Sequence, residues 1–142
     1  MSAKPGPPAP AFLDTNVLLR HLLQDDPRQS PRATALIGRI ETGEVRVRLT
    51  ETVVFETVFT LQRTYKRRPD AIREALLPIL ELPGVSLPQK ARLRRAFATY
   101  ADQHLPFADA YHAVLMSDLG LSEVYSFDED FDRISGITRL EP

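Results

Sequence analysis

The sequence contains no cysteine, no long apolar run and no large net charge. Without cysteine, disulfides, thiolate metal sites and cysteine nucleophiles are all excluded, which favours a cytoplasmic protein over a secreted one. No uninterrupted apolar run approaches the roughly 20 residues that span a membrane, so a membrane protein is not expected. The 142 residues are 43% hydrophobic and 26% charged, which is typical of a globular domain able to bury a core.

The chain also lacks an excess of basic over acidic residues. The net charge of −1 gives no overall attraction to nucleic acid. Of the 18 basic residues, 15 are arginine, which suits bidentate contacts to phosphate, although a codon usage that favours arginine explains the count equally well. A bound polyanion would therefore need local clusters of arginine. The candidates are Arg20, Arg46, Arg48, Arg63, Arg67, Arg68, Arg92, Arg94 and Arg95.

Residues 1–10 contain four prolines, one lysine and no apolar segment like that of a signal peptide. We interpret this stretch as a flexible Pro-rich leader. The rest of the chain, residues 11–142, shows no linker, internal repeat or low-complexity tract and is expected to form one domain.

From residue 11 onward, short apolar runs alternate with amphipathic segments. Strands are expected at 11–13, 45–49, 124–127 and 136–140, and residues 85–87 could form a minor strand or a loop. Helices are expected over about 15–25, 30–42, 50–65, 71–80, 90–102 and 110–119. This alternation predicts an α/β sandwich around a mainly parallel sheet of four or five strands.

Four acidic residues occupy positions that such a fold could bring together. Asp14 and Asp128 each follow a predicted strand, Asp109 lies in the first turn of a helix, and Glu56 lies within an apolar helix. The carboxyl ends of parallel strands meet at one edge of a sheet, where α/β proteins bind ligands. We therefore expect the four carboxylates to converge there.

Two simpler interpretations apply to single members of this set. Asp14 could serve only as a helix cap, because aspartate is a good N-cap residue. Burial of an uncompensated carboxylate is costly, so Glu56 is expected to be paired, metal-bound or turned toward a cleft. Alternatively, Glu56 belongs to a partly exposed stripe with Thr52 and Arg63.

A cluster of carboxylates requires a cation. Two like charges about 4 Å apart repel by roughly 4 kcal/mol at an effective dielectric of 20. Ligation by oxygen without cysteine suits Mg²⁺ or Mn²⁺, which keep water ligands and bridge to phosphate oxygens. The chemistry expected of such a centre is metal-assisted hydrolysis at phosphorus.

Four stretches of the sequence resemble the four acidic motifs of PIN-domain ribonucleases, in the same order along the chain. The similarity is greatest to the VapC-like toxins of bacterial toxin–antitoxin pairs, and it extends from about Phe12 to the end of the chain. The motifs are Leu13-Asp14-Thr15-Asn16-Val17-Leu18, Val53 to Leu61 around Glu56, Phe107-Ala108-Asp109-Ala110, and Ser126-Phe127-Asp128-Glu129-Asp130-Phe131.

The resemblance implies a PIN-like three-layer α/β/α sandwich that cleaves RNA with Mg²⁺ or Mn²⁺. It further implies a cognate antitoxin that blocks the enzyme, and a homodimer. By the same resemblance, the metal-binding acids are Asp14, Glu56, Asp109 and Asp128, with Asp130 as a secondary ligand and Thr15, Asn16 and Ser126 in supporting positions.

Other polar residues near the motifs have less specific interpretations. Glu51 is expected in the first turn of its helix and Asp132 on a helix surface, and neither is expected to be a metal ligand. His104 and His112 could act as acid–base groups, but structural or substrate-contact roles are favoured because metal-assisted hydrolysis requires neither.

Two alternative functions follow from the same acids. An aspartate-based phosphotransfer protein fits poorly, because a haloacid-dehalogenase-type nucleophile would need aspartate where Asn16 stands, and a receiver domain would need a lysine beyond Lys90. The other alternative is a catalytically inert PIN-like module that binds RNA or protein. The presence of all four acids argues against it.

Overall fold

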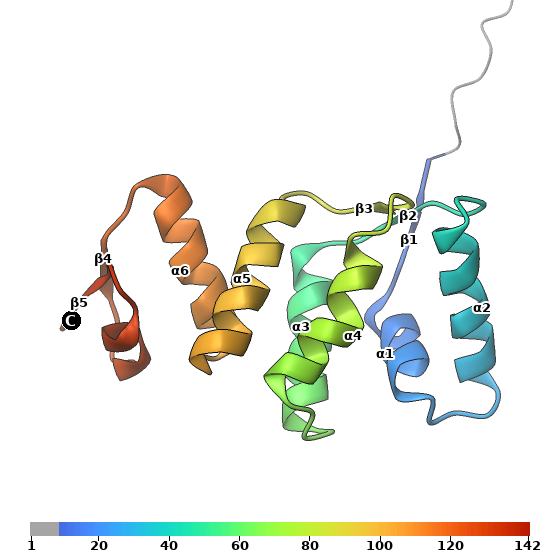
Figure 1. Ribbon diagram of the computed structural model, residues 1–142, viewed down its shortest axis with the longest axis horizontal. Helices are drawn as coiled ribbons and strands as arrows, with labels where there is room; N and C mark the ends of the chain where they lie inside the picture. The colour runs from blue at the N-terminus through green and yellow to red at the C-terminus, as the bar shows by residue number, and fades with distance from the viewer. Residues whose placement is uncertain (1–8) are drawn as a thin grey trace, which may run out of the picture. The chain divides into compact units, whose positions relative to one another are not determined.

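The computed structural model describes residues 9–142, and this part of the chain contains six α-helices, one 3-10 helix and five short strands (Figure 1). It consists of two compact units. Among the described residues, the first comprises 9–57 and Pro78–Pro88, and the second comprises Val58–Leu77 and Gln89–Pro142. Helices α3 (Glu51–Arg63) and α4 (Pro69–Leu80) each contribute residues to both units.

The first unit contains a parallel three-stranded sheet in the order β1-β2-β3. Its strands are β1 (Ala11–Phe12), β2 (Val47–Arg48) and β3 (Val85–Ser86). Val47 lies opposite Ala11 on one side and Val85 on the other. Helices α1 (Thr15–Leu23) and α2 (Gln29–Glu41) pack side by side in this unit (Figure 1). Its buried residues include Leu13, Leu18, Ile37, Ile40, Val47 and Leu49.

Aspartate side chains determine where the first two helices begin. Asp14 is the N-cap of α1, and its carboxylate accepts a hydrogen bond of 2.9 Å from the backbone N–H of Thr15. Asp26 Oδ1 accepts hydrogen bonds from the backbone N–H groups of Arg28 and Gln29, at 2.9 and 2.7 Å. These two bonds hold the pKa of Asp26 below its usual value. Helix α2 begins at Gln29, one residue before the start predicted from the sequence.

Gly84 lies where the backbone of the first unit is tightly packed. A Cβ atom at this position would lie 2.8 Å from the Ile40 carbonyl oxygen and 3.0 Å from the Val45 carbonyl oxygen. Gly84→Ala is expected to lower the free energy of unfolding by about 1–3 kcal/mol, because backbone must shift to admit the methyl group. Urea unfolding followed by circular dichroism measures the change.

Gly38→Ala is the matched control, since a Cβ at Gly38 would meet no atom within 4 Å. Gly38 lies inside α2, so alanine there is expected to raise stability by about 0.5–1 kcal/mol. Equal stability of the two variants would contradict the close packing inferred at Gly84.

The second unit contains a helix pair and a two-stranded parallel sheet. Helices α5 (Lys90–Gln103) and α6 (Phe107–Leu119) pack side by side (Figure 1). Strand β4 (Glu123–Tyr125) pairs with β5 (Thr138–Leu140), and the 3-10 helix η1 (Glu129–Arg133) lies between them in the chain.

Aromatic packing holds α5 against the start of α6. The Phe107 ring lies 4.7 Å from the Phe97 ring and 5.4 Å from the Tyr100 ring, measured between centroids. Phe97 and Tyr100 are fully buried, and the Tyr100 hydroxyl donates a hydrogen bond to Gln62 Oε1. Burial of each such ring contributes about 1.5–3 kcal/mol, so this cluster fixes the helix on which Asp109 lies.

The structure confirms the α/β class and the parallel strands, and the helix boundaries agree with the predicted ones to within a few residues. Residues 85–86 form a strand, where the sequence left strand and loop open. The five strands form two sheets, of three and two strands, where one sheet was expected. Each strand is only two or three residues long, and β4 and β5 belong to the second unit.

Most of the predicted leader, residues 1–8, lies outside the described part of the chain. Among residues 9–142, no helix combines the length and apolar character that crossing a membrane requires.

Candidate metal centre

Three carboxylates of the second unit form a cluster suited to a metal ion. Asp109 lies in the first turn of α6, Asp128 is the N-cap of η1, and Asp130 lies within η1. One carboxylate oxygen from each residue lies within 4.8 Å of the other two. The structure thus brings together three of the five predicted site residues.

A short hydrogen-bonded turn positions the two acids that follow β4. The Asp128 carboxylate accepts a 2.9 Å hydrogen bond from the backbone N–H of Asp130. The Ser126 hydroxyl accepts a bond of the same length from the backbone N–H of Asp128. Asp128 therefore acts as an N-cap and still faces the cluster, and Ser126 fixes the turn from the strand side.

The electrostatics of the cluster favour a proton or a cation. Burial raises the pKa of Asp109 to about 6, and the hydrogen bond and negative charge of Asp128 and the charge of Asp130 add to this effect. The Asp130 backbone N–H, together with Asp109, lowers the pKa of Asp128. Of these two carboxyls, Asp109 is therefore the one that takes up a proton first as the pH falls through about 6.

One oxygen of Asp109 is left without a partner. Asp109 Oδ2 is buried, and it accepts no hydrogen bond from any residue between 9 and 142. A buried carboxylate oxygen without a donor costs free energy, more so beside two other carboxylates. A divalent cation would satisfy this oxygen and offset the repulsion, and three carboxylates are the hard oxygen donors that Mg²⁺ and Mn²⁺ prefer. The residues present thus fit such an ion.

Two arginines that sequence analysis did not single out stabilise the surroundings of the cluster. Arg133 Nη2 lies 3.1 Å from Asp130 Oδ1. Arg139 on β5 donates to both carboxylate oxygens of Asp132, at 3.0 and 3.2 Å, and to the Ser126 carbonyl oxygen at 3.1 Å. Asp132 is therefore an ion-pair partner and not a member of the cluster, as expected. Because Arg133 follows Asp130 by three residues, their ion pair could have been predicted from the sequence.

The other two predicted acids lie in the first unit, where Thr15 connects them. The Thr15 hydroxyl donates a 2.9 Å hydrogen bond to Glu56 Oε2, and the Thr15 backbone N–H donates to Asp14 Oδ1. Thr15 is only 5% exposed, whereas both acids are exposed. Asp14 therefore caps α1, as the simpler interpretation predicted. The cap uses only Oδ1, so Oδ2 makes no bond to Thr15.

Glu56 has a hydrogen-bond partner, the Thr15 hydroxyl, which agrees with the expectation that it is paired. Glu56 lies on an exposed stripe of α3 with Thr52 and Arg63, as the alternative interpretation proposed. Phe59 belongs to this stripe and is 60% exposed, with the Arg63 guanidinium 5.5 Å from its ring centroid. The buried side of the helix is formed by Val53, Val54, Thr57, Val58 and Leu61.

At least five of the candidate phosphate-binding arginines have partners within the described residues, namely Arg20, Arg48, Arg68, Arg92 and Arg95. Arg92 and Arg95 both bind Asp118, at 2.9 and 2.5 Å, and thereby connect α5 to α6. Their guanidinium groups lower the pKa of Asp118. His104 is the exposed C-cap of α5, and His112 is exposed on α6, so neither belongs to the carboxylate cluster.

The fold and the cluster define an α/β protein with an all-carboxylate candidate site for a divalent cation. The chain belongs to the PIN domain family, whose sequence profile matches residues 11–137. It is 27% identical over 131 residues to the VapC ribonuclease of Aquifex aeolicus (strain VF5), an alignment that covers 92% of this chain and 96% of that protein. The family resemblance predicted from the four acidic motifs is confirmed.

Proposed function

We propose that the protein is a metal-dependent endoribonuclease that hydrolyses RNA phosphodiester bonds as the toxin of a toxin–antitoxin pair. The observation that carries this proposal is the partnerless buried oxygen of Asp109 in a cluster with Asp128 and Asp130. Membership of the PIN domain family and the distant similarity to a VapC ribonuclease support RNA as the substrate.

Asp109, Asp128 and Asp130 are the residues that would hold Mg²⁺ or Mn²⁺. The bound ion would supply an activated water and stabilise charge on the attacked phosphoryl group. The carboxylates differ in protonation before the ion binds. Asp109 must lose its proton to accept the ion, whereas the Asp130 backbone N–H keeps Asp128 ionised.

Asp14 and Glu56 are proposed to take part in the same reaction. Their support is the order of the acidic motifs within a family match that spans residues 11–137. The Thr15 hydroxyl restrains the Glu56 carboxylate on an otherwise exposed helix face. A restrained carboxylate loses less side-chain entropy when it binds a cation or a water molecule.

The proposal is tested by incubating the purified protein with single-stranded RNA in Mn²⁺, in Mg²⁺ and in EDTA. Cleavage within the RNA is expected with either ion and not in EDTA, and sequencing of the new RNA ends identifies the cut site. Absence of cleavage, together with absence of Mn²⁺ binding in isothermal titration, would instead support the inert binding module.

Partner binding forms part of the proposed function. The resemblance to VapC-like toxins implies a small antitoxin and a homodimer, and the similarity to a VapC ribonuclease supports the antitoxin. Co-purification with the product of the adjacent reading frame tests the antitoxin. A monomeric protein that no such product inhibits would contradict this part of the proposal.

A further inference from the structure

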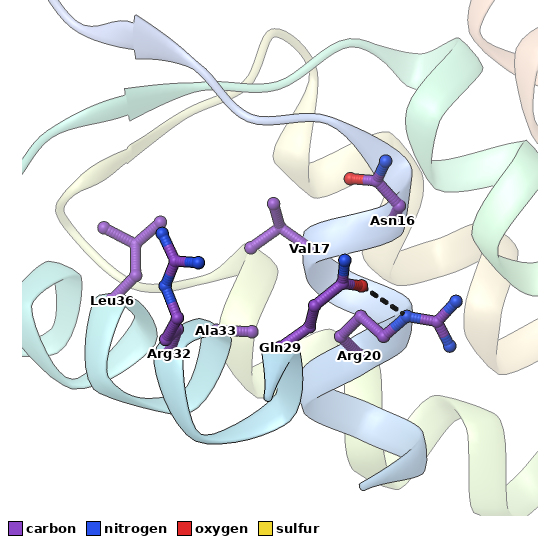
Figure 2. A pocket seen from close by; sticks show the side chains of 7 residues that line it. All are labelled: Asn16, Val17, Arg20, Gln29, Arg32, Ala33 and Leu36. Atoms are coloured by element: carbon purple, nitrogen blue, oxygen red, sulfur yellow. Dashed lines mark hydrogen bonds between the residues drawn. The ribbon is translucent and has the colours of Figure 1, made fainter. Parts of the chain in front are cut away.

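Helices α1 and α2 line a surface pocket of about 340 Å³ in the first unit, and Figure 2 shows its lining side chains. Its apolar lining consists of Val17 on α1 and of Ala33 and Leu36 on α2. Its polar lining consists of Asn16, Arg20, Gln29 and Arg32, without a carboxylate among the lining residues. The polar groups come from both helices, so the pocket exists only when the two helices are packed together.

The polar lining consists mainly of hydrogen-bond donors. Arg32 is exposed, and it makes no ion pair or hydrogen bond within residues 9–142. Gln29 Oε1 accepts a 3.0 Å hydrogen bond from Arg20 Nε, drawn as the dashed line in Figure 2, so the Gln29 amide N–H groups point away from that arginine. Arg20 also binds both Asp25 oxygens, at 3.0 and 3.1 Å, which fixes its position and offsets its charge.

The remaining positive charge of the pocket is therefore that of Arg32. With the Gln29 amide and Asn16 as neutral polar partners, the pocket suits one anionic group beside an apolar surface. A guanidinium without an internal partner is well suited to a phosphate, because its planar N–H groups match phosphate oxygens.

Size and position narrow the choice of ligand. Small-molecule pockets have volumes of roughly 300–1,000 Å³, so this one is at the low end and suits a single nucleotide unit. The apolar lining can contact a base or a ribose, and the amides of Asn16 and Gln29 can hydrogen-bond to a base edge. Asn16 is also only two residues from Asp14, a predicted site acid.

We propose that this pocket binds one nucleotide of the RNA substrate, with Arg32 on a phosphate and the Gln29 amide on the same nucleotide. The inference rests on the proposed ribonuclease function and adds a recognition site that sequence analysis did not identify. Of the arginines predicted to contact phosphate, only Arg20 lines this pocket, where it holds the Gln29 side chain. Arg32 was not among those candidates.

The test measures binding of a short fluorescent single-stranded RNA by anisotropy in EDTA, where no cleavage occurs. Arg32→Glu is expected to weaken binding about tenfold, as for loss of a charge-assisted hydrogen bond. The dependence of log Kd on log salt concentration should also lose about 0.7 of slope, as for one single-strand phosphate contact. Arg28→Glu, the same charge change one helical turn earlier and outside the pocket, is the control.

Gln29→Glu tests whether RNA binding depends on the pocket itself, without loss of the fold. The new carboxylate can still accept the hydrogen bond from Arg20, so the variant is expected to fold and melt like the wild type. It nevertheless places a negative charge beside the proposed phosphate, so RNA binding should weaken about tenfold. In amide NMR spectra, adenosine monophosphate should shift signals of α1 and α2 more than adenosine does.

Equal weakening by Arg28→Glu and Arg32→Glu would overturn the proposal, because it would show diffuse attraction without a pocket. Normal RNA binding by both pocket variants, with loss of a protein partner, would also overturn it and assign the pocket to that partner. Wild-type protein that binds RNA through the pocket but does not cleave it with Mn²⁺ would support this inference and contradict the proposed function.

Discussion

Asp109→Asn is expected to abolish Mn²⁺-dependent RNA cleavage while the protein remains folded. Loss of a group that only orients a metal ligand typically costs 10–100-fold, so loss of a ligand carboxylate should reduce the rate by at least about 100-fold. The asparagine has the same shape but cannot bring negative charge to the ion. Initial rates of RNA cleavage at a Mn²⁺ concentration that saturates the wild type measure the effect, and circular dichroism establishes that the fold is retained.

Glu129→Gln is the matched control for this variant. Glu129 is an exposed acid of η1, next to Asp128 and Asp130, and it does not belong to the carboxylate cluster. Neutralising it changes the net charge by the same amount and should leave the rate within about twofold, because exposed charges act weakly through solvent. Full activity of Asp109→Asn, or equal losses in the two variants, would contradict the assignment of Asp109 as a metal ligand.

The sequence was informative wherever a residue's position depends on its neighbours in the chain. Asp14 was predicted to follow a strand and precede a helix, and it lies between β1 and α1. Asp109 was predicted in the first turn of a helix, and it lies in the first turn of α6. Asp128 was predicted to follow a strand directly, but β4 ends at Tyr125, three residues earlier. Helix capping also depends on residues close in the chain. Asp14 and Asp128 each accept a hydrogen bond from a backbone N–H within the next two residues.

Features that depend on distant residues could not be predicted in this way. Glu56 was predicted to lie within an apolar helix, but which of the apolar side chains of that helix are buried is decided by tertiary packing, and Phe59 is 60% exposed. Arg139 is paired with Asp132 across a turn, and no local spacing indicates that pair. The α1–α2 pocket likewise needs two packed helices, so Arg32 could not be distinguished from any other arginine on a helix.

The raised pKa of Asp109 and the metal affinity of the cluster have one physical origin. Burial next to two carboxylates disfavours the ionised group, and either a proton or a divalent ion relieves that cost. Proton and metal must therefore compete for the same oxygens. This competition makes the stability of the protein depend on pH in a direction that identifies the site.

Asp109→Asn is expected to melt at a higher temperature than the wild type at pH 7.5 without divalent ions, and this difference should shrink as the pH falls. The folded-state pKa of Asp109, about 6, exceeds its ordinary value of 3.8, so the ionised group opposes folding fully above pH 6. Between about pH 6 and 3.8 the folded state takes up the proton first, and the wild type regains stability. After allowance for solvent screening, the difference is on the order of 1 kcal/mol, or a few degrees in Tm.

Mn²⁺ should reverse this order at pH 7.5, because the ion binds the wild type and not the variant. At a concentration near 100 times its Kd, an ion that binds only the folded state adds about 2.7 kcal/mol, or roughly 5–10 °C in Tm. The gain should fall steeply below pH 6, where a proton occupies Asp109. Thermal melts of both proteins from pH 4 to 8, with and without Mn²⁺, measure all of these differences. A Mn²⁺ effect that is equal in both proteins, or that does not change across pH 6, would place the ion away from Asp109.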